Sequence, residues 1–593
     1  MASHRLRFDM KTSKPFLWAA ALLGFALFLY FWGLGRVPFY TKGEPREAVQ
    51  VWEEVHGGEW VLPLRNGHDL PSKPPLFHWL AGIASLAFGE VDEFSLRFPS
   101  AALATLSVLL VFWLGMKKWG TNAGLFAAFV LATNFEWIRA ATTARVDMTL
   151  TAFLIAAFVA LDRLVSAPAP ASRPLAAFYL SMALATLGKG PVGILLPALV
   201  AVTYLALRGD LARLKQMRVL AGGVAAVALA GAWYVLAVAH VGKEFLYKQL
   251  WVENVGRFFA AGATGAGHEH PFYYMIGGFF TGFAPWSFFV IPLGIYLCAN
   301  RRRLEALGYL YPIVWFAVVF VFYSVSASKR TVYLLPLYPA AALLLGAWWS
   351  RITAEPEAVP LLLVRVLRGV AVGLTVALVA AILVLLAAGL GADPLAVLRP
   401  LLHPKDQANL ALLESLVRDR FPSFALFVAA LVPMIVIWLL SVRHKNWSLL
   451  FAALVAFVVS GEVVVNEVFK PALAEQRSFK PFMESVRGVV DDTDTLSFYR
   501  AFDYGAVFYA RRHIPPLRDG FGDPPGPNAR AYVLLWKSRW DRLPPEQQGR
   551  LQHLLTSAGT GPKGRDALVF ALVKPIPAPP PVTEIPRTDS RAP

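Results

Sequence analysis

A single lysine, Lys73, stands between Ser72 and two prolines in the segment "SKPPL", and an apolar run follows it. Prolines restrict the backbone, so the cation is held at a defined place beside that run. A lysine in this setting can bind a phosphate as a point charge. The alternative is a lysine whose ammonium group only reaches the membrane interface. Because a rigid turn is a poor place for an idle flexible side chain, we favour the phosphate role.

Two carboxylates are candidates for acid–base chemistry. Glu44 lies beside Arg46 in "GEPREA", where it could serve as a general base or a metal ligand, or only favour the dipole at the start of a helix. Asp147 enters an apolar run in "RVDMTLTAF", where a carboxylate is costly unless it faces a cavity or pairs with a cation such as Arg145. Glu44 and Asp147 are therefore the candidate catalytic residues.

Further cations are spread along the chain at the edges of apolar segments. The two glycines around Lys189 in "GKGPVG" allow another chain or a ligand to approach the backbone, or form a tight turn between helices. Arg257 has the guanidinium geometry that suits a phosphate. An adjacent Lys–Arg pair precedes a tyrosine in "SKRTVYLLPLYP". The candidate substrate-binding residues are Arg46, Lys73, Lys189, Arg257, Lys329, Arg330 and Tyr333.

The segment "GHEHP" places the imidazoles of His268 and His270 on either side of Glu269. Two imidazoles and a carboxylate are ligands that a divalent metal ion accepts. A polar loop without a metal explains the same residues. The sequence thus predicts a possible divalent metal ion at His268, Glu269 and His270, and no other cofactor.

The elements that position these residues are mostly membrane-spanning helices. The chain has 593 residues, 56% of them hydrophobic and only 16% charged, with a mean hydropathy of +0.51. About thirteen apolar segments are long enough to span a bilayer. The predicted spans are 15–34, which is expected to be retained as a first span, 96–116, 121–138, 146–165, 174–188, 191–208, 218–240, 272–298, 309–325, 331–350, 362–390, 422–441 and 447–467. The shorter segment 75–88 fits an interfacial helix.

Basic residues in alternate loops define the expected orientation. The net charge of +17 resides largely in short loops, a pattern that points to topology and anionic lipid, with no nucleic-acid partner. With the N-terminus cytoplasmic, the loops that carry the candidate site residues lie outside. The single cysteine, Cys298, allows no internal disulfide.

The predicted fold class is an all-α polytopic membrane protein with interfacial helices and a small C-terminal α/β domain. We expect a transmembrane domain over 1–469, a soluble α/β domain over 470–575 on the outer side, and a Pro-rich disordered tail over 576–593. Acids and cations that gather on one outer face suit a transfer reaction on a lipid phosphate. A transporter or flippase of lipid-linked substrates is the rival class, but internal repeats and midplane charges, which are typical of transporters, are not evident in the sequence.

Ten segments in order carry a family resemblance: "GEPREA", "GEWVLPLRNG", "SKPPLFHWL", "LRFPSAL", "RVDMTLTAF", "GKGPVG", "ENVGRF", "HPFYY", "PWS" and "SKRTVYLLPLYP". Over roughly residues 15–350 the chain resembles the lipid-linked-sugar glycosyltransferases of the GT-C fold. The bacterial aminoarabinose transferases that modify lipid A are more similar than the protein O-mannosyltransferases. Thirteen spans with an outer C-terminal domain also agree with the aminoarabinose type.

The resemblance implies a polyprenyl-phosphate sugar donor, transfer at the periplasmic face of the bacterial inner membrane, and inversion at the anomeric carbon. The acceptor it implies is lipid A, another glycan or a protein. By position Glu44 and Asp147 match the family's catalytic acids, and Lys73, Arg257, Lys329 and Tyr333 match contacts to the donor phosphate. His268 or His270 matches a metal-associated histidine. Two departures stand out: Gly43 where the family often has Asp, and Ser72 where an acid often precedes the lysine.

Overall fold

Helices make up most of the chain in the computed structural model, which describes residues 15–574 apart from 260–268, 358–359, 395, 397–398, 403, 523, 525, 527, 563 and 565. His268 and the tail 576–593 therefore lie outside the described residues. The described chain divides into two units. One comprises residues up to Pro38 together with Arg46–Leu473, and the other comprises Phe39–Pro45 together with the chain from Ala474 onward.

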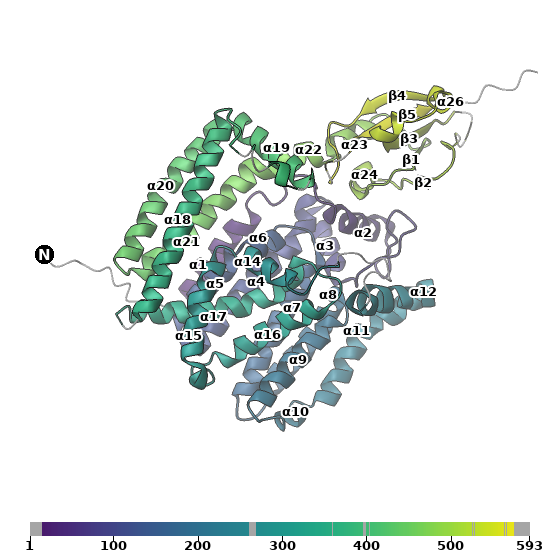
Figure 1. Cartoon of the computed structure of the whole chain (residues 1–593). Coiled ribbons are helices and arrows are strands. Elements are labelled where there is room, and N and C mark those ends of the chain that lie inside the picture. Colours follow the sequence, from purple (N-terminus) through teal and green to yellow (C-terminus); the bar gives the residue numbers. More distant parts are fainter. Residues whose placement is uncertain are drawn as a thin grey trace, which may run out of the picture. The chain divides into compact units, whose positions relative to one another are not determined.

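The helical unit contains all of the predicted spans, and each predicted segment is largely helical (Figure 1). Its first half consists of α1 (Pro15–Phe31), α2 (Glu44–Gly57), α3 (Leu76–Phe88), α4 (Glu93–Trp119), α5 (Thr121–Ala132), α6 (Phe135–Ala141), α7 (Val146–Ser166), α8 (Ser172–Lys189), α9 (Val192–Leu207), α10 (Arg213–Gln216), α11 (Val219–Val241), α12 (Lys243–Leu246), η2 (Tyr247–Gly256) and α13 (Arg257–Phe259).

The second half of this unit carries the remaining helices. These are α14 (Tyr274–Gly282), η3 (Trp286–Phe289), α15 (Val290–Ala299), η4 (Arg301–Arg303), α16 (Leu310–Val325), η5 (Thr331–Leu337), α17 (Tyr338–Ala354), α18 (Leu361–Gly389), η6 (Arg399–Leu401), α19 (Pro404–Asp419), α20 (Phe421–Arg443), α21 (Trp447–Val464), η7 (Val465–Phe469) and α22 (Lys470–Arg477), whose last residues belong to the other unit. In Figure 1 α18, α20 and α21 run side by side.

Seven helices among the described residues are long and apolar enough to cross a membrane, or eight if the bent pair α14 and η3–α15 forms one span. Five shorter apolar helices, including α1 and α3, accompany them. The protein is therefore a multi-pass membrane protein with the predicted helical class, while the count of thirteen spans stays a prediction. The segment 75–88 forms the helix α3, and its interfacial position stays a prediction.

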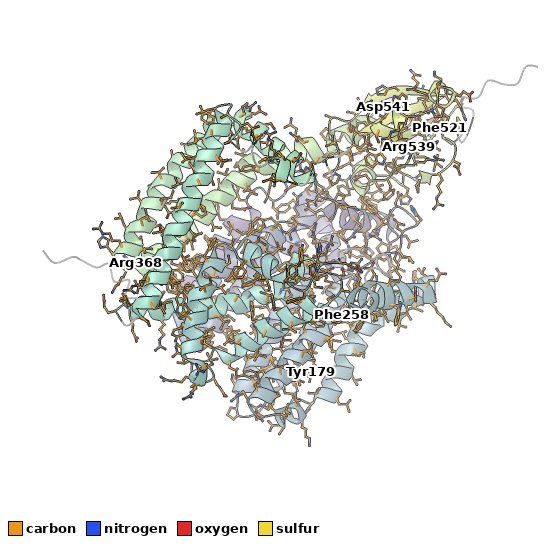
Figure 2. All side chains as sticks on the ribbon, in the orientation of Figure 1. Tyr179, Phe258, Arg368, Phe521, Arg539 and Asp541 are labelled. Atoms are coloured by element: carbon orange, nitrogen blue, oxygen red, sulfur yellow. The ribbon has the colours of Figure 1, made fainter. Side chains whose placement is uncertain are left out.

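Close helix packing in this bundle depends on small residues. A side-chain carbon added to Gly346 of α17 would collide with the backbone of Ala127 in α5, so the two helices touch along their backbones. Such close approach is typical of helices that pack inside a membrane. Large aromatic side chains fill the remaining volume, and Trp137, Trp286 and Trp349 are fully buried. Side chains occupy the spaces between the ribbons, as around Tyr179 of α8, whose hydroxyl donates to the Met217 carbonyl (Figure 2).

The second unit is a small α/β domain, as the sequence predicts. It contains α23 (Lys480–Arg487), β1 (Thr495–Tyr499), α24 (Tyr504–Ala510), β2 (Pro516–Leu517), β3 (Ala531–Trp536), α25 (Lys537–Trp540), α26 (Pro545–Gly549), β4 (Leu551–Thr556) and β5 (Leu568–Val573). The strand order is β2-β1-β3-β5-β4. β1 pairs in parallel with β2 and β3, while β5 runs antiparallel to β3 and β4. Val533, Leu535 and Val569 form part of its buried core.

Candidate active site

The loop that carries Lys73 is fastened to η2. Lys248 and Gln249 at the start of η2 donate hydrogen bonds to the carbonyls of Leu70 at 3.0 Å and Pro71 at 2.9 Å. α3 then begins directly after Pro75, because proline presets a helix-compatible backbone and lacks an N–H that would need a partner there. The Lys73 side chain is thus held against η2, as the two prolines suggested.

Glu253 of η2 joins two of the predicted phosphate ligands. Its carboxylate accepts a hydrogen bond from the Lys73 ammonium at 2.9 Å, and it forms an ion pair with the Arg257 guanidinium at 3.0 Å. The side chains of Lys73 and Glu253 are only 14% and 10% exposed. The Nε of Arg257 is buried and makes no hydrogen bond within the described part of the chain. A buried donor without a partner is costly, so this guanidinium has unused capacity for an anion.

The electrostatics of this triad follow from its burial. Burial lowers the pKa of Lys73 below its usual range, and the Glu253 carboxylate offsets only part of that effect. Burial alone would raise the pKa of Glu253, but Lys73 and Arg257 together hold it below its usual range. The triad contributes one acid against two cations.

Asp147 and Lys189 form a second acid–cation pair. Asp147 lies in the first turn of α7 and Lys189 is the last residue of α8, and their charged groups form an ion pair. Each side chain is 12% exposed. Arg145 and Arg330 lie near enough to act electrostatically on the same carboxylate. The direct partner of Asp147 is thus Lys189, with Arg145, the partner considered from sequence, acting as a neighbour.

Tyr333 lies between the two pairs. The Lys189 ammonium stands 4.1 Å from the centre of its ring, and Tyr333 interacts electrostatically with both Lys73 and Arg257. The contact at Gly190 explains the glycines around Lys189, because a side-chain carbon there would lie 2.9 Å from the Asn254 amide oxygen of η2. Glycine therefore allows the α8–α9 turn to approach η2, the first of the two roles considered for these glycines. Five predicted residues come together in one cluster: Lys73, Asp147, Lys189, Arg257 and Tyr333.

Lys329 and Arg330 lie in a loop that pairs with the neighbouring segments. Backbone N–H groups of Ala327 and Ser328 donate to the carbonyls of Phe258 and Arg257 at 2.8 and 3.0 Å. The ammonium of Lys329 is buried and donates to the Ser326 carbonyl at 2.6 Å. Arg330 borders the cluster through Asp147, whereas Lys329 stabilises its own loop.

Arg46 and Glu44 both lie near the start of α2. Arg46 donates from Nε to Glu47 at 3.0 Å, and Glu47 is bonded at 2.8 Å to His78 of α3. Burial would raise the pKa of Glu47, but Arg46 and His78 hold it well below its usual range. Arg46 also acts electrostatically on Glu253 and so borders the cluster. Glu44 accepts a hydrogen bond from Thr41 at 3.1 Å, and both residues belong to the segment grouped with the second unit.

The predicted metal ligands are described only in part. Glu269 pairs through its backbone with Ser328, and the His270 ring stacks on Tyr274 with ring centres 4.0 Å apart. No group of three or more His, Cys, Asp or Glu side chains that could hold a metal ion occurs among the residues described. A catalytic zinc ion is usually held by three protein side chains, and Glu269 and His270 supply only two. His268 lies outside the described residues.

Sequence reasoning missed the role of Glu253. Its carboxylate joins Lys73 to Arg257. The spacing of four residues between Glu253 and Arg257 was the available signal, since residues at this spacing meet on one helix face. Its contact with Lys73, 180 residues away in sequence, had no such signal.

Parts of the chain are similar in sequence to known proteins. Residues 72–238 match the sequence model of the dolichyl-phosphate-mannose-protein mannosyltransferase family. The chain is 30% identical over 337 residues to an undecaprenyl phosphate-alpha-4-amino-4-deoxy-L-arabinose arabinosyl transferase of Aeromonas hydrophila, covering 56% of this chain and 59% of that protein. It is also 30% identical over 324 residues to an uncharacterized protein of Aquifex aeolicus, covering 54% of this chain and 61% of that protein. These matches span about three fifths of the relatives' length.

The solved structure of ArnT from Cupriavidus metallidurans bound to undecaprenyl phosphate has the same fold. It superposes with a TM-score of 0.73 and 19% identity, covering 93% of this chain and 98% of that one. The chain therefore shares the fold of ArnT. In sequence it is similar to an aminoarabinose arabinosyl transferase over about half of its length.

Proposed function

We propose that the protein is an integral-membrane glycosyltransferase that moves a sugar from a polyprenyl-phosphate donor to an acceptor at the outer face of the bacterial inner membrane. The observation that carries this proposal is the cluster of Lys73, Glu253, Arg257, Tyr333, Lys189 and Asp147, which joins cations and acids from distant segments at the ends of membrane helices. The similar protein of Aeromonas hydrophila is an undecaprenyl phosphate-aminoarabinose arabinosyl transferase, which supports the same class of donor here.

In the proposed reaction the bond between the anomeric carbon and the phosphate oxygen breaks while an acceptor oxygen bonds to that carbon from the opposite side. The leaving group is the polyprenyl phosphate, whose added negative charge is stabilised by Lys73 and Arg257. Fixed cations in a site that excludes water stabilise such developing charge strongly. The donor phosphate would take the position toward both cations that the Glu253 carboxylate now holds, and the free Nε–H of Arg257 offers it a further hydrogen bond.

The acceptor determines how much base catalysis is needed. A phosphate acceptor, as on lipid A, is already ionised and transfers with little deprotonation. A hydroxyl acceptor must lose a proton, which Asp147 or Glu44 would take. Asp147 is anionic in its ion pair with Lys189, as a general base must be. Lys189 would have to move aside before the Asp147 carboxylate could accept a proton.

Transfer onto protein hydroxyls is the second candidate function. The match of residues 72–238 to a protein mannosyltransferase family favours it. The two functions are separated by incubating the purified full-length protein with a polyprenyl-phosphate sugar and either lipid A or a Ser/Thr-rich peptide. Mass spectrometry of each acceptor gives the result. Sugar on lipid A supports the first, sugar on peptide supports the second, and sugar on neither contradicts both.

Two further points complete the proposal. The N-terminus would be cytoplasmic and the C-terminal domain periplasmic, so alkaline phosphatase fused after residue 593 should be active. A divalent metal at His268, Glu269 and His270 stays a prediction. Loss of transfer in EDTA and its recovery with Mn²⁺ would support it, and unchanged transfer in EDTA would contradict it.

A further inference from the structure

A cavity of about 450 Å³ lies at the end of the bundle opposite the candidate active site. The last turns of α4 and α7, the loop 167–171 and the start of α8 line it. α7 connects the two places, because Asp147 lies in its first turn and Asp162 and Arg163 lie near its end. At about 1.5 Å per residue its 21 residues span roughly the thickness of a bilayer's hydrocarbon core.

Cations are in excess at this cavity. Lys118 forms an ion pair with the buried Asp162, the single acid of the lining. Lys117 and Arg163 are exposed and have no carboxylate partner in the described part of the chain. Arg163 stacks 4.1 Å from the centre of the Trp113 ring, and Lys117 lies 6.0 Å from the same centre. Two cations without acid partners therefore border one aromatic ring at the mouth of the cavity.

The walls of the cavity are largely apolar and are fixed in place. Trp113, Ala167, Ala171 and Pro174 supply apolar surface beside the two cations. The buried Arg213 of α10 donates hydrogen bonds to the carbonyls of Ala167 and Pro168, the latter at 2.8 Å, and so holds the loop against the bundle. The cavity thus combines an apolar wall with a cationic mouth at one end of a helix that is long enough to cross a bilayer.

We propose that this cavity binds an anionic phospholipid in the leaflet opposite the transfer site. The phosphate would lie between Lys117 and Arg163, and the glycerol and the first methylenes of an acyl chain would lie against Trp113 and the alanines. Basic pockets between transmembrane helices on the cytoplasmic side are suited to such head groups. A free phosphate would share the cationic contacts but would make no use of the apolar wall. The proposal is independent of the reaction at the other face.

The test uses native mass spectrometry of the full-length protein with phosphatidylglycerol, phosphatidylcholine or inorganic phosphate. The variant pair is Lys117→Glu with Arg163→Glu, and Lys117→Gln with Arg163→Gln serves if the first pair fails to fold. The matched control is Lys215→Glu with Arg218→Glu, which makes the same charge change in exposed residues at the same end of the bundle but outside the cavity lining. Size-exclusion chromatography confirms that each variant is folded.

We expect the parent protein and the control to retain phosphatidylglycerol in preference to phosphatidylcholine. The cavity variant should bind it roughly tenfold or more weakly, since each lost surface cation weakens binding to anionic lipid. Equal retention of the two lipids would overturn the proposal, as would equal loss in the cavity variant and the control. Competition by millimolar inorganic phosphate as strong as that by the lipid would also overturn it, because the ligand would then be a free anion.

Discussion

Replacing Lys73 by Gln and Glu253 by Gln should change donor affinity in opposite directions. Lys73 and Glu253 are bonded at 2.9 Å, and Arg257 shares the same carboxylate at 3.0 Å. In the proposed mechanism the donor phosphate replaces that carboxylate. Loss of the lysine removes a ligand of the phosphate, whereas loss of the acid removes an internal competitor for the two cations.

The magnitudes follow from the contacts. A hydrogen bond to a charged group contributes about 1.5–3 kcal/mol, so Lys73→Gln should weaken the binding of undecaprenyl phosphate by roughly 10- to 150-fold. The side chain is largely buried, so solvent screening reduces this range little. Glu253→Gln should tighten binding by about tenfold at most, since removing the charge also ends the attraction that holds Lys73 and Arg257 in place.

Binding of fluorescent undecaprenyl phosphate to the purified full-length protein in nanodiscs measures both effects. Lys243→Gln is the control, because Lys243 is exposed on the adjacent α12 and is not part of the cluster. Size-exclusion profiles verify folding. If Lys73 only supported the fold, both substitutions would weaken binding together. Equal weakening in Lys73→Gln and Glu253→Gln, or unchanged affinity in Lys73→Gln, would refute the phosphate role.

Three more outcomes are expected. Asp147→Asn should lower turnover with a hydroxyl acceptor by roughly 10²-fold or more if Asp147 is the base, and steady-state kinetics should place the loss in kcat. Donor affinity should fall at a lower pH than the titration of an ordinary lysine would give, because burial lowers the pKa of Lys73. Lys73→Arg should move that fall to higher pH, as binding titrations at several pH values can check. Glu47→Gln should lower unfolding stability by about 1–3 kcal/mol at neutral pH because the buried His78 loses its partner. The pKa of Glu47 is lowered in the fold, so the stability difference between the parent protein and Glu47→Gln should shrink as pH falls below about 4. Thermal unfolding followed by circular dichroism measures this difference. Equal stability of the two proteins at pH 7 would contradict the prediction.

The fold class was predictable because the membrane imposes it. A segment in lipid must satisfy its backbone polar groups internally, so long apolar runs must form helices, and each predicted span is helical. The α/β domain was predictable from the alternation of strand and helix patterns after residue 470. Composition alone does not fix the number of spans. The helices α1 and α5 are short for a span, and the segment 272–298 bends by 110° between its two helices.

The members of the site were more predictable than its pairings. Charge beside apolar runs identified Lys73, Asp147 and Lys189, because such charge is costly without a partner or a ligand. Which acid meets which cation depends on tertiary contacts across 42 residues for Asp147 and Lys189 and 180 residues for Lys73 and Glu253. No periodic pattern in the sequence predicts contacts between residues so far apart in the chain. Arg145, only two residues from Asp147, was the nearest candidate by sequence, but Lys189 is the direct partner.

The charge balance of the cluster bears on product release, which is a common limit on turnover. The cations Lys73, Arg257 and Lys189 face two acids, Glu253 and Asp147. The donor is a phosphodiester with one negative charge, whereas the product monoester approaches two near neutral pH. The cations that stabilise the leaving phosphate would therefore also retain the product, and Glu253 would assist release by competing for Lys73 and Arg257. Glu253→Gln should accordingly give a burst of one sugar transferred per protein followed by a slower steady state, even though it binds the lipid phosphate more tightly. Rapid-quench measurement of transferred sugar tests this, and a steady state as fast as that of the parent protein would show that Glu253 does not assist release.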